Sequence, residues 1–499
     1  MRAKSGKRQV GRATPGRLRA VGTTRWKQGV PPHLAEPLER ALAAAERNEV
    51  GEALKWFGVC ADKCDGPRDP HMKPIVYFGA QAASSAYFAL RGAGQEVGQT
   101  VVDEWRACAE TLIRAAGELD PGDPVAAHNV GRFLHGCDDW DAAVAMYRIA
   151  LQLKGTQVES WANLGTAYAN QGDRDGARRC WMKATAFAPE NPSGALAQSY
   201  IWLRAGDYTK GWAAFEHRWN DLEFKRGYGR EKELTGTRWM GEALPKGATL
   251  FVHGEQGLGD HVQFARFVPA LVERGIRIVG LETRPTLVRW MEGALPGLPI
   301  VPRGGEIPQH THHVSSMSLP NILGLTLDTV PPPVAPVVRT LRAVNPHHRK
   351  RVALAWCGAA GNPADGVRSI PEHELARLRG IDVDWVSVQF TPLAGMIARS
   401  YLGNDVTDAS QTCRDVFDTA EVMAGCDLVV CVDTLTAHLA GSLGLPTLLL
   451  QRFDREWRWG DAATGDERTP WYPSIRQLTQ TAPSDWSGPI DAVRRELGG

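Results

Sequence analysis

The 499-residue sequence predicts an N-terminal α-helical solenoid followed by two doubly wound, Rossmann-like α/β halves, an α plus α/β class. Three observations predict this class. Helical segments repeat with a constant period, strand-length apolar runs then alternate with helical segments, and a Pro-rich stretch divides this second region. The expected parts are a basic tail over 1–28, helical repeats over 32–222, a connector over 223–246, and α/β halves over 247–335 and 347–499.

Bulk composition narrows the possible partners and compartments. The net charge is +1, so no global field favours nucleic acid or a membrane surface. The nine cysteines lack a regular spacing, and no apolar run approaches the roughly 20 residues that cross a bilayer. The tail over 1–28 is basic and has no hydrophobic segment behind it, which is unlike a secretory signal. We expect a cytoplasmic protein with a solvated, disordered tail; contact of this tail with nucleic acid is the less common alternative.

The helical region carries a repeat with a period of about 34 residues. Trp161, Leu164-Gly165 and Tyr168 stand at the offsets of the tetratricopeptide signature, followed by Ala177, Ala184 and Pro189. One period earlier, Gly131 and Tyr147 take the places of Gly165 and Trp181, and one period later Phe215 takes that of Trp181. Further helices are expected over 38–57 and 103–119. Such arrays stack into a curved solenoid whose concave face commonly holds a partner.

The stretch from Leu428 to Leu450 predicts a β-α-β unit. An apolar run ends at Asp433, a helical segment extends to Gly444, and a second apolar run follows Pro446. Asp433 and Thr434 therefore belong to the carboxyl edge of a parallel sheet, where open α/β sheets bind ligands. The helix start over Thr434, Thr436, Ala437 and His438 suits a phosphate. The alternative is that Asp433 and Thr434 only cap the helix and His438 only packs.

A glycine-rich turn follows the expected strand Thr249–Val252. Gly254, Gly257 and Gly259 stand in the order Gly-x-x-Gly-x-Gly, the reverse of the dinucleotide fingerprint, so a nicotinamide cofactor is not supported. Asp260 comes next, at the start of a helix expected to continue to about Arg274. Its carboxylate is a candidate for chemistry at the sheet edge; alternatively, it only complements the helix dipole.

Seven motifs in the α/β region give a resemblance to a known family. The sequence resembles the heptosyltransferase-like (family 9-like) glycosyltransferases of the GT-B superfamily, in the branch with tetratricopeptide repeats before the transferase. The motifs span about Leu250 to Trp486 and are Gly254-Glu-Gln-Gly-Leu-Gly-Asp260 with Gln263-Phe-Ala-Arg266, Ser318-Leu-Pro320, Arg368-Ser-Ile-Pro371, Val386-Ser-Val-Gln389, Asp433-Thr434 with Ala437-His-Leu-Ala-Gly441, Trp457-Arg-Trp459 and Pro470-Trp-Tyr-Pro473.

The resemblance implies an inverting, metal-independent glycosyltransferase. The first half would hold a hydroxyl acceptor, which could be a protein, a peptide or a glycan near the repeats, and the second half a nucleotide-diphosphate sugar. Asp260 would be the general base. No cofactor is implied beyond this donor, and the residues implied at its site are Gly257, Gly259, Gly358, Arg368, Gln389, Asp433, Thr434, Thr436, Ala437 and His438.

Two departures from the family pattern keep a second hypothesis open. Phe390 stands where the family usually carries Lys, and the loop Gly361–Val367 is altered. The alternative function is a non-catalytic adaptor that binds a protein partner through its repeats.

Other candidate features are assigned to structure rather than to chemistry. We expect the pair Asp382 and Asp384 to be solvated loop and 311–316 to be a polar edge rather than part of a zinc site of His310, His312 and His313. We expect Trp457, Trp459 and Trp471 to be core rather than a sugar-binding surface.

Overall fold

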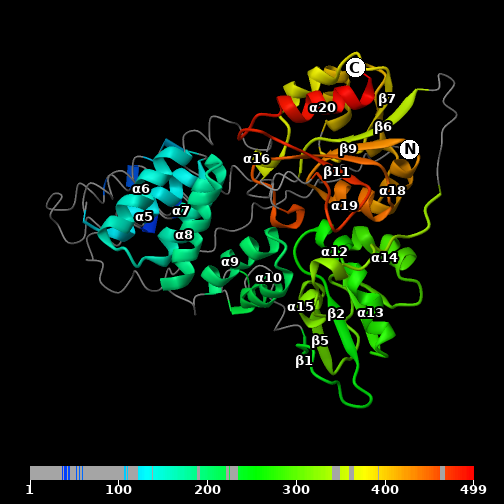
Figure 1. Ribbon diagram of the computed structural model, residues 1–499, viewed down its shortest axis with the longest axis horizontal. Coiled ribbons are helices and arrows are strands. Elements are labelled where there is room, and N and C mark those ends of the chain that lie inside the picture. Colours follow the sequence, from blue (N-terminus) through cyan, green and yellow to red (C-terminus); the bar gives the residue numbers. More distant parts are fainter. Residues whose placement is uncertain are drawn as a thin grey trace, which may run out of the picture. The chain divides into compact units, whose positions relative to one another are not determined.

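Figure 1 shows a computed structural model of the chain. It describes residues 122–137, 139–187, 192–220, 234–339, 349–358, 365–391, 393–460 and 467–498, with isolated positions among 36–59, 106–110 and at 224. The described chain forms two compact units, one up to Leu164 and one from Gly165 onward. The basic tail over 1–28 and most of the helices expected over 38–57 and 103–119 lie outside the described residues.

Well-capped helices build the first unit. They are α5 (Pro124–Gly136), α6 (Trp140–Leu153) and the start of α7 (Val158–Gln171). Asp123 caps α5 by accepting a hydrogen bond from the amide of Val125 (2.8 Å). Helices α5 and α6 pack closely because Gly131 has no side chain: a Cβ there would lie 2.8 Å from the Tyr147 ring. This contact confirms the pairing expected from the repeat period.

The second unit continues the helical pattern. After the end of α7 come α8 (Arg174–Phe187), α9 (Pro192–Arg204), α10 (Tyr208–Phe215) and the short turn η2 (Glu216–Asn220). A Cβ on Gly165 would lie 2.5 Å from the Trp181 ring, the contact of Gly131 and Tyr147 repeated 34 residues later. At the next equivalent place, buried Ser199 replaces glycine and Phe215 supplies the ring.

The first α/β half contains a parallel sheet with the strand order β1-β5-β2-β3-β4. Its strands are β1 (Thr237–Arg238), β2 (Leu250–His253), β3 (Ile278–Thr283), β4 (Ile300–Pro302) and β5 (His312–Ser315). The connecting helices are α12 (Leu258–Phe264), η3 (Ala265–Phe267), α13 (Val268–Glu273), η4 (Pro285–Leu287), α14 (Val288–Ala294), η5 (Ser316–Ser318), α15 (Leu319–Ile322) and η6 (Leu327–Thr329). The predicted alternation of strands and helices is confirmed.

Strand β1 lies within residues 223–246, which were expected to form a connector, and its two exposed side chains show no apolar alternation. Two local expectations for this half are wrong. The expected polar edge over 311–316 contains strand β5, which is paired on both sides and largely buried. The single helix expected to reach Arg274 breaks at η3, because Pro269 offers no N–H to continue the helix.

The second α/β half contains a parallel sheet with the strand order β11-β10-β9-β6-β7-β8. Its strands are β6 (Lys350–Ala355), β7 (Val383–Ser387), β8 (Thr407–Asp408), β9 (Leu428–Val432), β10 (Thr447–Gln451) and β11 (Ile475–Thr479). The helices are α16 (Asp365–Arg368), η7 (Glu372–Leu378), α17 (Ala394–Leu402), η8 (Ala409–Gln411), α18 (Val416–Ala424), α19 (Leu435–Ser442), η9 (Trp457–Trp459) and α20 (Ser487–Leu497). The β-α-β unit expected over 428–450 is confirmed as β9-α19-β10.

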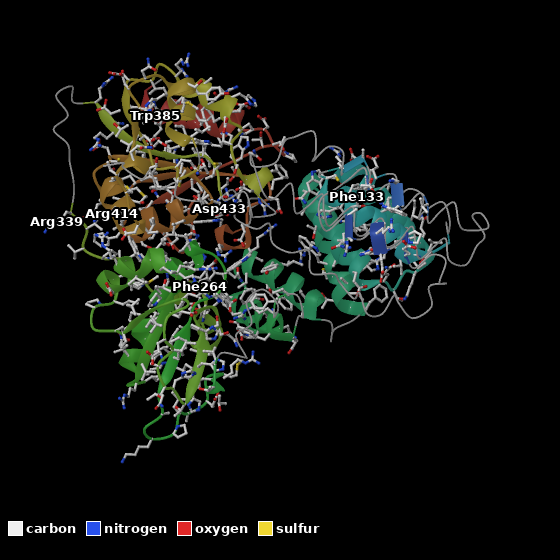
Figure 2. All side chains as sticks on the ribbon, turned by 180° about the vertical axis from the view of Figure 1, so that it is seen from behind. Phe133, Phe264, Arg339, Trp385, Arg414 and Asp433 are labelled. Atoms are coloured by element: carbon white, nitrogen blue, oxygen red, sulfur yellow. The ribbon has the colours of Figure 1, made fainter. Side chains whose placement is uncertain are left out.

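An aromatic core joins the repeat helices of the second unit to both α/β halves. Trp212 of α10 contacts Phe264 of α12, with ring centroids 5.7 Å apart, and Trp457 of η9, with centroids 5.4 Å apart. The expectation that Trp457, Trp459 and Trp471 belong to the core is confirmed, since they are 6%, 1% and 1% exposed. Figure 2 labels Phe264 in the first half and Asp433 in the second.

Candidate functional site

The candidate site lies at the points where both sheets reverse their strand order. In the second sheet the chain runs outward from β6 to β8 and then continues on the other side from β9. In the first sheet it runs outward from β2 to β4 and returns on the other side as β5. Ligands of open α/β sheets bind at such switch points, beyond the carboxyl ends of the strands. The Gly254–Asp260 loop follows β2, and Asp433 follows β9, so both occupy this position.

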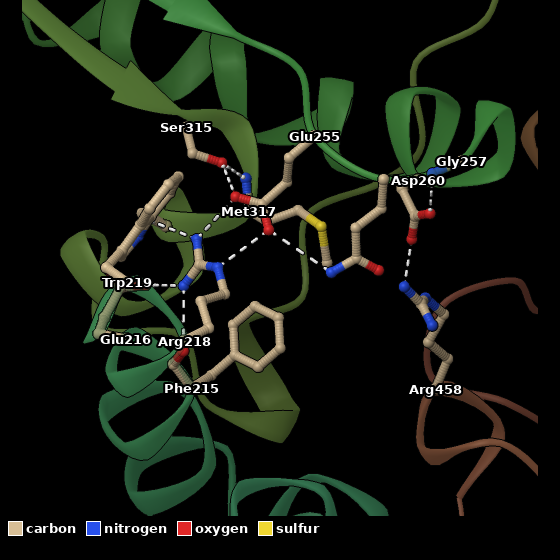
Figure 3. Close-up of polar contacts among 12 residues, drawn as sticks. Phe215, Glu216, Arg218, Trp219, Glu255, Gly257, Asp260, Ser315, Met317 and Arg458 are labelled. Atoms are coloured by element: carbon tan, nitrogen blue, oxygen red, sulfur yellow. Dashed lines mark hydrogen bonds and ion pairs between the residues drawn. The ribbon is translucent and has the colours of Figure 1, made fainter. Parts of the chain in front are cut away.

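Asp260 stands in the first turn of α12. Its Oδ2 accepts a hydrogen bond from the amide of Gly257 (2.8 Å), and its Oδ1 forms an ion pair with Arg458 of the second half (Figure 3). Burial raises the pKa of Asp260 above its ordinary value, and the positive charge of Arg458 opposes this rise. Each carboxylate oxygen has two lone pairs, so both oxygens can still accept a further proton donor.

The loop before Asp260 holds a backbone conformation that L-residues rarely adopt. Gln256 has φ +63°, in the left-handed region, and its carbonyl oxygen accepts a hydrogen bond from Arg284 (3.2 Å). Such conformations cost on the order of 1–3 kcal/mol and persist where the surroundings fix them. The turn that aims Asp260 is therefore fixed by a contact from the neighbouring strand end.

The N-terminus of α19 has no side-chain cap within the described part of the chain. Thr434 is its N-cap residue, with an extended backbone. The Thr434 hydroxyl donates to the carbonyl oxygen of Val432 (3.3 Å) and, among the described residues, makes no cap hydrogen bond to the helix. The first amides of a helix lack partners within it and carry the positive end of its dipole. Thr436 and Ala437 lie buried in this first turn.

Helices α12 and α19 meet at Gly259 and His438 (Figure 1). A Cβ on Gly259 would lie 2.5 Å from Cδ2 of His438. Burial lowers the pKa of His438 well below its ordinary value, and Arg458 and Arg266 lower it further. The imidazole is therefore neutral near pH 7, with Nδ1 3.0 Å from the Tyr472 hydroxyl. The structure thus brings together Gly259, Asp260 and the first turn of α19.

Sequence reasoning assigned no role to Arg458, although the motif Trp457-Arg-Trp459 contains it. Its Nη1 donates to Glu456 (2.5 Å) and its Nε to the side-chain oxygen of Gln263 (3.1 Å). Burial alone would lower the pKa of Arg458, but Asp260, Glu456 and Asp433 together raise it. Asp433 therefore belongs to the same electrostatic cluster as Asp260. We call Asp260, Asp433, Glu456 and Arg458 the ionic cluster.

Gln263 and Arg266, one and two turns after Asp260, also hold the two halves together. Gln263 accepts the hydrogen bond from Arg458. Arg266 is buried and donates to the carbonyl oxygen of Trp471 (2.9 Å). The motif Gln263-Phe-Ala-Arg266 is visible in the sequence. Its partners Arg458 and Trp471 lie about 200 residues further along the chain, so a local sequence pattern could not reveal these contacts.

The remaining expected donor residues form a second group at the same edge of the second sheet. Gln389, after β7, accepts from the amides of Trp356 and Cys357 after β6 (both 3.1 Å). Gly358 lies against the side chains of Arg368 and Asp365, which pair with each other (3.2 Å). Strands β6 and β9 are neighbours, with Ala355 opposite Cys431, so Gly358 after β6 and Asp433 after β9 follow adjacent strands, and Gln389 follows the next strand, β7.

The departures noted in the sequence lie beside this second group. Phe390 is 50% exposed directly after Gln389. The altered loop Gly361–Val367 lies outside the described residues except at 365–367, the start of α16.

The described residues hold no obvious metal centre or membrane span. Within the part of the chain that the structure describes, no group of three or more His, Cys, Asp or Glu side chains could hold a metal ion. Asp382 is highly exposed, as expected for a solvated loop, but the same expectation is wrong for Asp384, which lies within strand β7 and is only 27% exposed; both pair with Arg349 (3.6 and 2.9 Å). The helices described above include none with the length and apolarity to cross a bilayer.

Comparisons with known proteins agree with the helical repeats. A family model for the tetratricopeptide repeat matches residues 158–191. Protein FlbA of Caulobacter vibrioides (strain ATCC 19089 / CIP 103742 / CB 15) is 24% identical over 424 residues, which cover 77% of this chain and 69% of FlbA.

Several solved structures resemble part of the chain weakly. A crystal structure of MamA is 14% identical, covers 37% of this chain and 96% of its own, and gives a TM-score of 0.26. TTC0263, a thermophilic tetratricopeptide protein in Thermus thermophilus, is 18% identical. The match covers 34% of this chain and 99% of TTC0263, with a TM-score of 0.23. Scores this low carry no argument about this chain. The chain therefore carries a tetratricopeptide repeat at residues 158–191, is similar to FlbA, and has two parallel α/β sheets after its helical repeats.

Proposed function

We propose that the protein is an inverting glycosyltransferase that moves a sugar from a nucleotide-diphosphate donor to a hydroxyl acceptor. The observation that carries the proposal is the contact of α12 with α19, in which Gly259, the neighbour of Asp260, lies against His438, at two sheet switch points. A carboxylate base close to a helix start that can bind an anion suits displacement of a phosphate leaving group. In this proposal, residues 247–335 hold the acceptor and 347–499 the donor.

The proposed reaction is a single displacement. Asp260 takes the proton of the acceptor hydroxyl while its oxygen forms a bond to the anomeric carbon of the sugar. The bond from this carbon to the diphosphate oxygen breaks, and the nucleoside diphosphate leaves with the electron pair. The amide of Thr436 and the guanidinium of Arg458 would stabilise the charge on the leaving oxygen. Arg368 would contact the phosphates and Gln389 the nucleoside.

The proposed roles have a definite protonation requirement. Asp260 must be ionised to act as a base, and its ion pair with Arg458 favours the ionised form against the effect of burial. His438 is neutral, so we assign it to shaping the α19 turn against Gly259 rather than to carrying charge.

Release of nucleoside diphosphate from a panel of activated sugars, with candidate peptide and glycan acceptors, tests the proposal. We expect release with at least one donor and a drop of about 10²–10⁴-fold for Asp260→Asn, the usual worth of a general base. Asp328→Asn is a matched control, because Asp328 also lies in a first helical turn of the same half but is exposed. Failure of every donor to bind or turn over would reject the proposal.

A second candidate function is a non-catalytic adaptor that binds a protein partner through its repeats. The exposed Phe390, where the resembling family usually has a cation, favours it. The adaptor hypothesis predicts a protein partner whose capture survives both Asp260→Asn and Arg368→Gln, together with no binding of any nucleoside diphosphate. Binding of one such nucleotide that is lost in Arg368→Gln would exclude it.

A further inference from the structure

The last repeat helices of the second unit contact the two segments that carry Asp260 and Arg458. We call α9, α10 and η2, residues 192–220, the repeat hairpin. Its side chains touch the Gly254–Asp260 loop on one side and the segment 452–459 on the other. Figure 3 shows Arg218 of this hairpin and the pair of Asp260 and Arg458 in one view.

Arg218 joins the repeat hairpin to the Gly254–Asp260 loop. It is fully buried, and its Nε and Nη2 donate to the two carboxylate oxygens of Glu255 (2.9 and 3.0 Å). The same Nη2 donates to Ser318 (2.8 Å), and Nη1 donates to Glu216 (2.8 Å). Two parallel N–H···O bonds fix the orientation of both partners. Glu255 immediately precedes the left-handed Gln256, so this contact holds the loop five residues before Asp260.

Arg204 joins the same hairpin to the segment that carries Arg458. Its Nη1 donates to Asp454 (2.5 Å) and its Nη2 to the carbonyl oxygen of Arg455 (2.7 Å). Tyr200, one turn earlier on α9, stacks on Trp457 with ring centroids 6.2 Å apart. Trp457, which precedes Arg458, is therefore packed on α9, and the backbone of Arg455 is hydrogen-bonded to the same helix.

Trp212 of α10 contacts both segments at once. Its ring meets Phe264, one turn after Asp260 on α12, and Trp457, the neighbour of Arg458, with both pairs edge to face. A rigid, fully buried ring between two elements transmits a displacement of either one, because close-packed interiors do not absorb it.

We propose that the repeat hairpin is a positioning element that sets Asp260 and Arg458 against each other, with Arg204 and Arg218 as its positioning residues. The catalytic part of this statement rests on the proposed function. The end of the repeat array is then part of the framework of the transfer site, and the two residues of the ion pair keep their alignment only while the hairpin is in place.

Hydrogen exchange of the full-length protein tests the positioning directly. We expect Arg204→Gln to speed exchange of amides in 452–459, and Arg218→Lys to speed exchange of amides in 254–260, by about tenfold or more, because each variant removes a fixed contact of that segment. Lys210→Gln is the matched control, since Lys210 lies on α10 but pairs only with exposed Asp207 among the described residues. Unchanged exchange in both segments for both arginine variants would overturn the inference, and so would equal acceleration in Lys210→Gln.

The pH profile of transfer gives a readout that a general loss of stability would not move. Displacing Arg458 removes a positive charge from Asp260, so the acid limb of kcat/KM should shift to higher pH in Arg204→Gln, and Arg204→Lys should restore part of this shift. An acid limb that stays in place while kcat falls would contradict the positioning role. Faster exchange in a protein that releases no nucleoside diphosphate would support the positioning and reject the proposed function. Arg204 is partly exposed, so its variants remain informative if Arg218→Lys fails to fold.

Discussion

Two arginines in the second unit, Arg218 and Arg289, each contact two carboxylates, but the first is buried and the second is exposed to solvent. Arg218 and Glu255 have 0% of their side chains exposed, and Glu216 completes the cluster at 2.8 Å. Arg289 of α14 lies 2.8 Å from both Asp415 and Asp418, with 44% of its side chain exposed. Both clusters join segments distant in the sequence, and their composition is nearly the same.

The difference shows that the surroundings, rather than the number of contacts, decide what such a cluster contributes. At the surface, water and salt already solvate each charge, so pairing adds little. In the interior, formation of the pair offsets a large desolvation cost, and removal of one partner leaves a charge without solvation. Burial lowers the pKa of Arg218, but Glu255 and Glu216 outweigh this effect and raise it. The buried cluster should therefore tolerate substitution far less than the exposed one.

The largest expected effect follows from Arg218→Met. Loss of the guanidinium leaves Glu255 buried without its partner, and we expect the free energy of unfolding to fall by about 3–5 kcal/mol. Urea denaturation followed by circular dichroism measures it. Adding Glu255→Gln and Glu216→Gln should restore part of the loss, because the uncompensated charges are gone; a triple variant as unstable as the single one would contradict the desolvation argument.

Arg458→Gln tests an ion pair of intermediate burial, since Asp260 and Arg458 are 12% and 11% exposed. We expect a loss of about 1–3 kcal/mol, typical of a hydrogen bond to a charged group. Removal of the positive charge also lets burial raise the pKa of Asp260 further. As the pH is lowered, Asp260 should therefore become protonated, and any transfer activity should be lost, at a higher pH than in the parent protein. Unfolding by urea and the acid limb of kcat/KM measure these effects. Arg458→Lys should keep the parent profile more closely.

Gly259→Ala tests the close approach of α12 and α19. The added methyl group would meet the buried His438 ring, and overpacking of this kind costs about 1–3 kcal/mol. Gly366→Ala is the control, because its Cβ would meet nothing within 4 Å. Thermal unfolding of the two variants compares them. Equal stability would show that the two helices can separate freely.

Arg289→Ala should have the smallest effect on stability, about 0.2–1 kcal/mol at low salt and less at 1 M NaCl. The same cluster gives a pH dependence. Hydrogen bonds from Arg414 and Arg289 lower the pKa of Asp418 below its ordinary value, so its contribution is present above the unfolded pKa near 4 and is lost as the pH falls further. The urea midpoint should therefore decrease between pH 7 and pH 3 in the parent protein, and this decrease should be smaller in Arg414→Ala.

Sequence patterns located the elements whose signals are local. The apolar runs around Asp433 predicted β9-α19-β10, and the period of 34 residues predicted the ring contacts of Gly131 and Gly165. Strands β1 and β8 were missed because two residues cannot show an alternation, and β5 because His312 and His313 resemble a polar loop.

The candidate site divides in the same way. Asp260 and the first turn of α19 could be predicted because each follows a recognisable strand-to-helix turn. Their meeting could not, because it depends on packing between halves. Arg458 reaches Asp260 across 198 residues and Arg218 reaches Glu255 across 37, and neither pair leaves a periodic trace. Trp212 lies in the region expected to form helical repeats, 32–222, and also belongs to the core of the α/β halves.

The burial of Trp212 sets a limit on how the protein can be divided. A fragment that starts at residue 247 would expose the faces of Phe264, Trp457 and Trp471 that this indole covers. It would also leave the buried Glu255 without the guanidinium of Arg218. Such a fragment should aggregate on expression, whereas one that starts ahead of α9 keeps these surfaces closed. The smallest soluble piece containing both sheets therefore includes the final helices of the array.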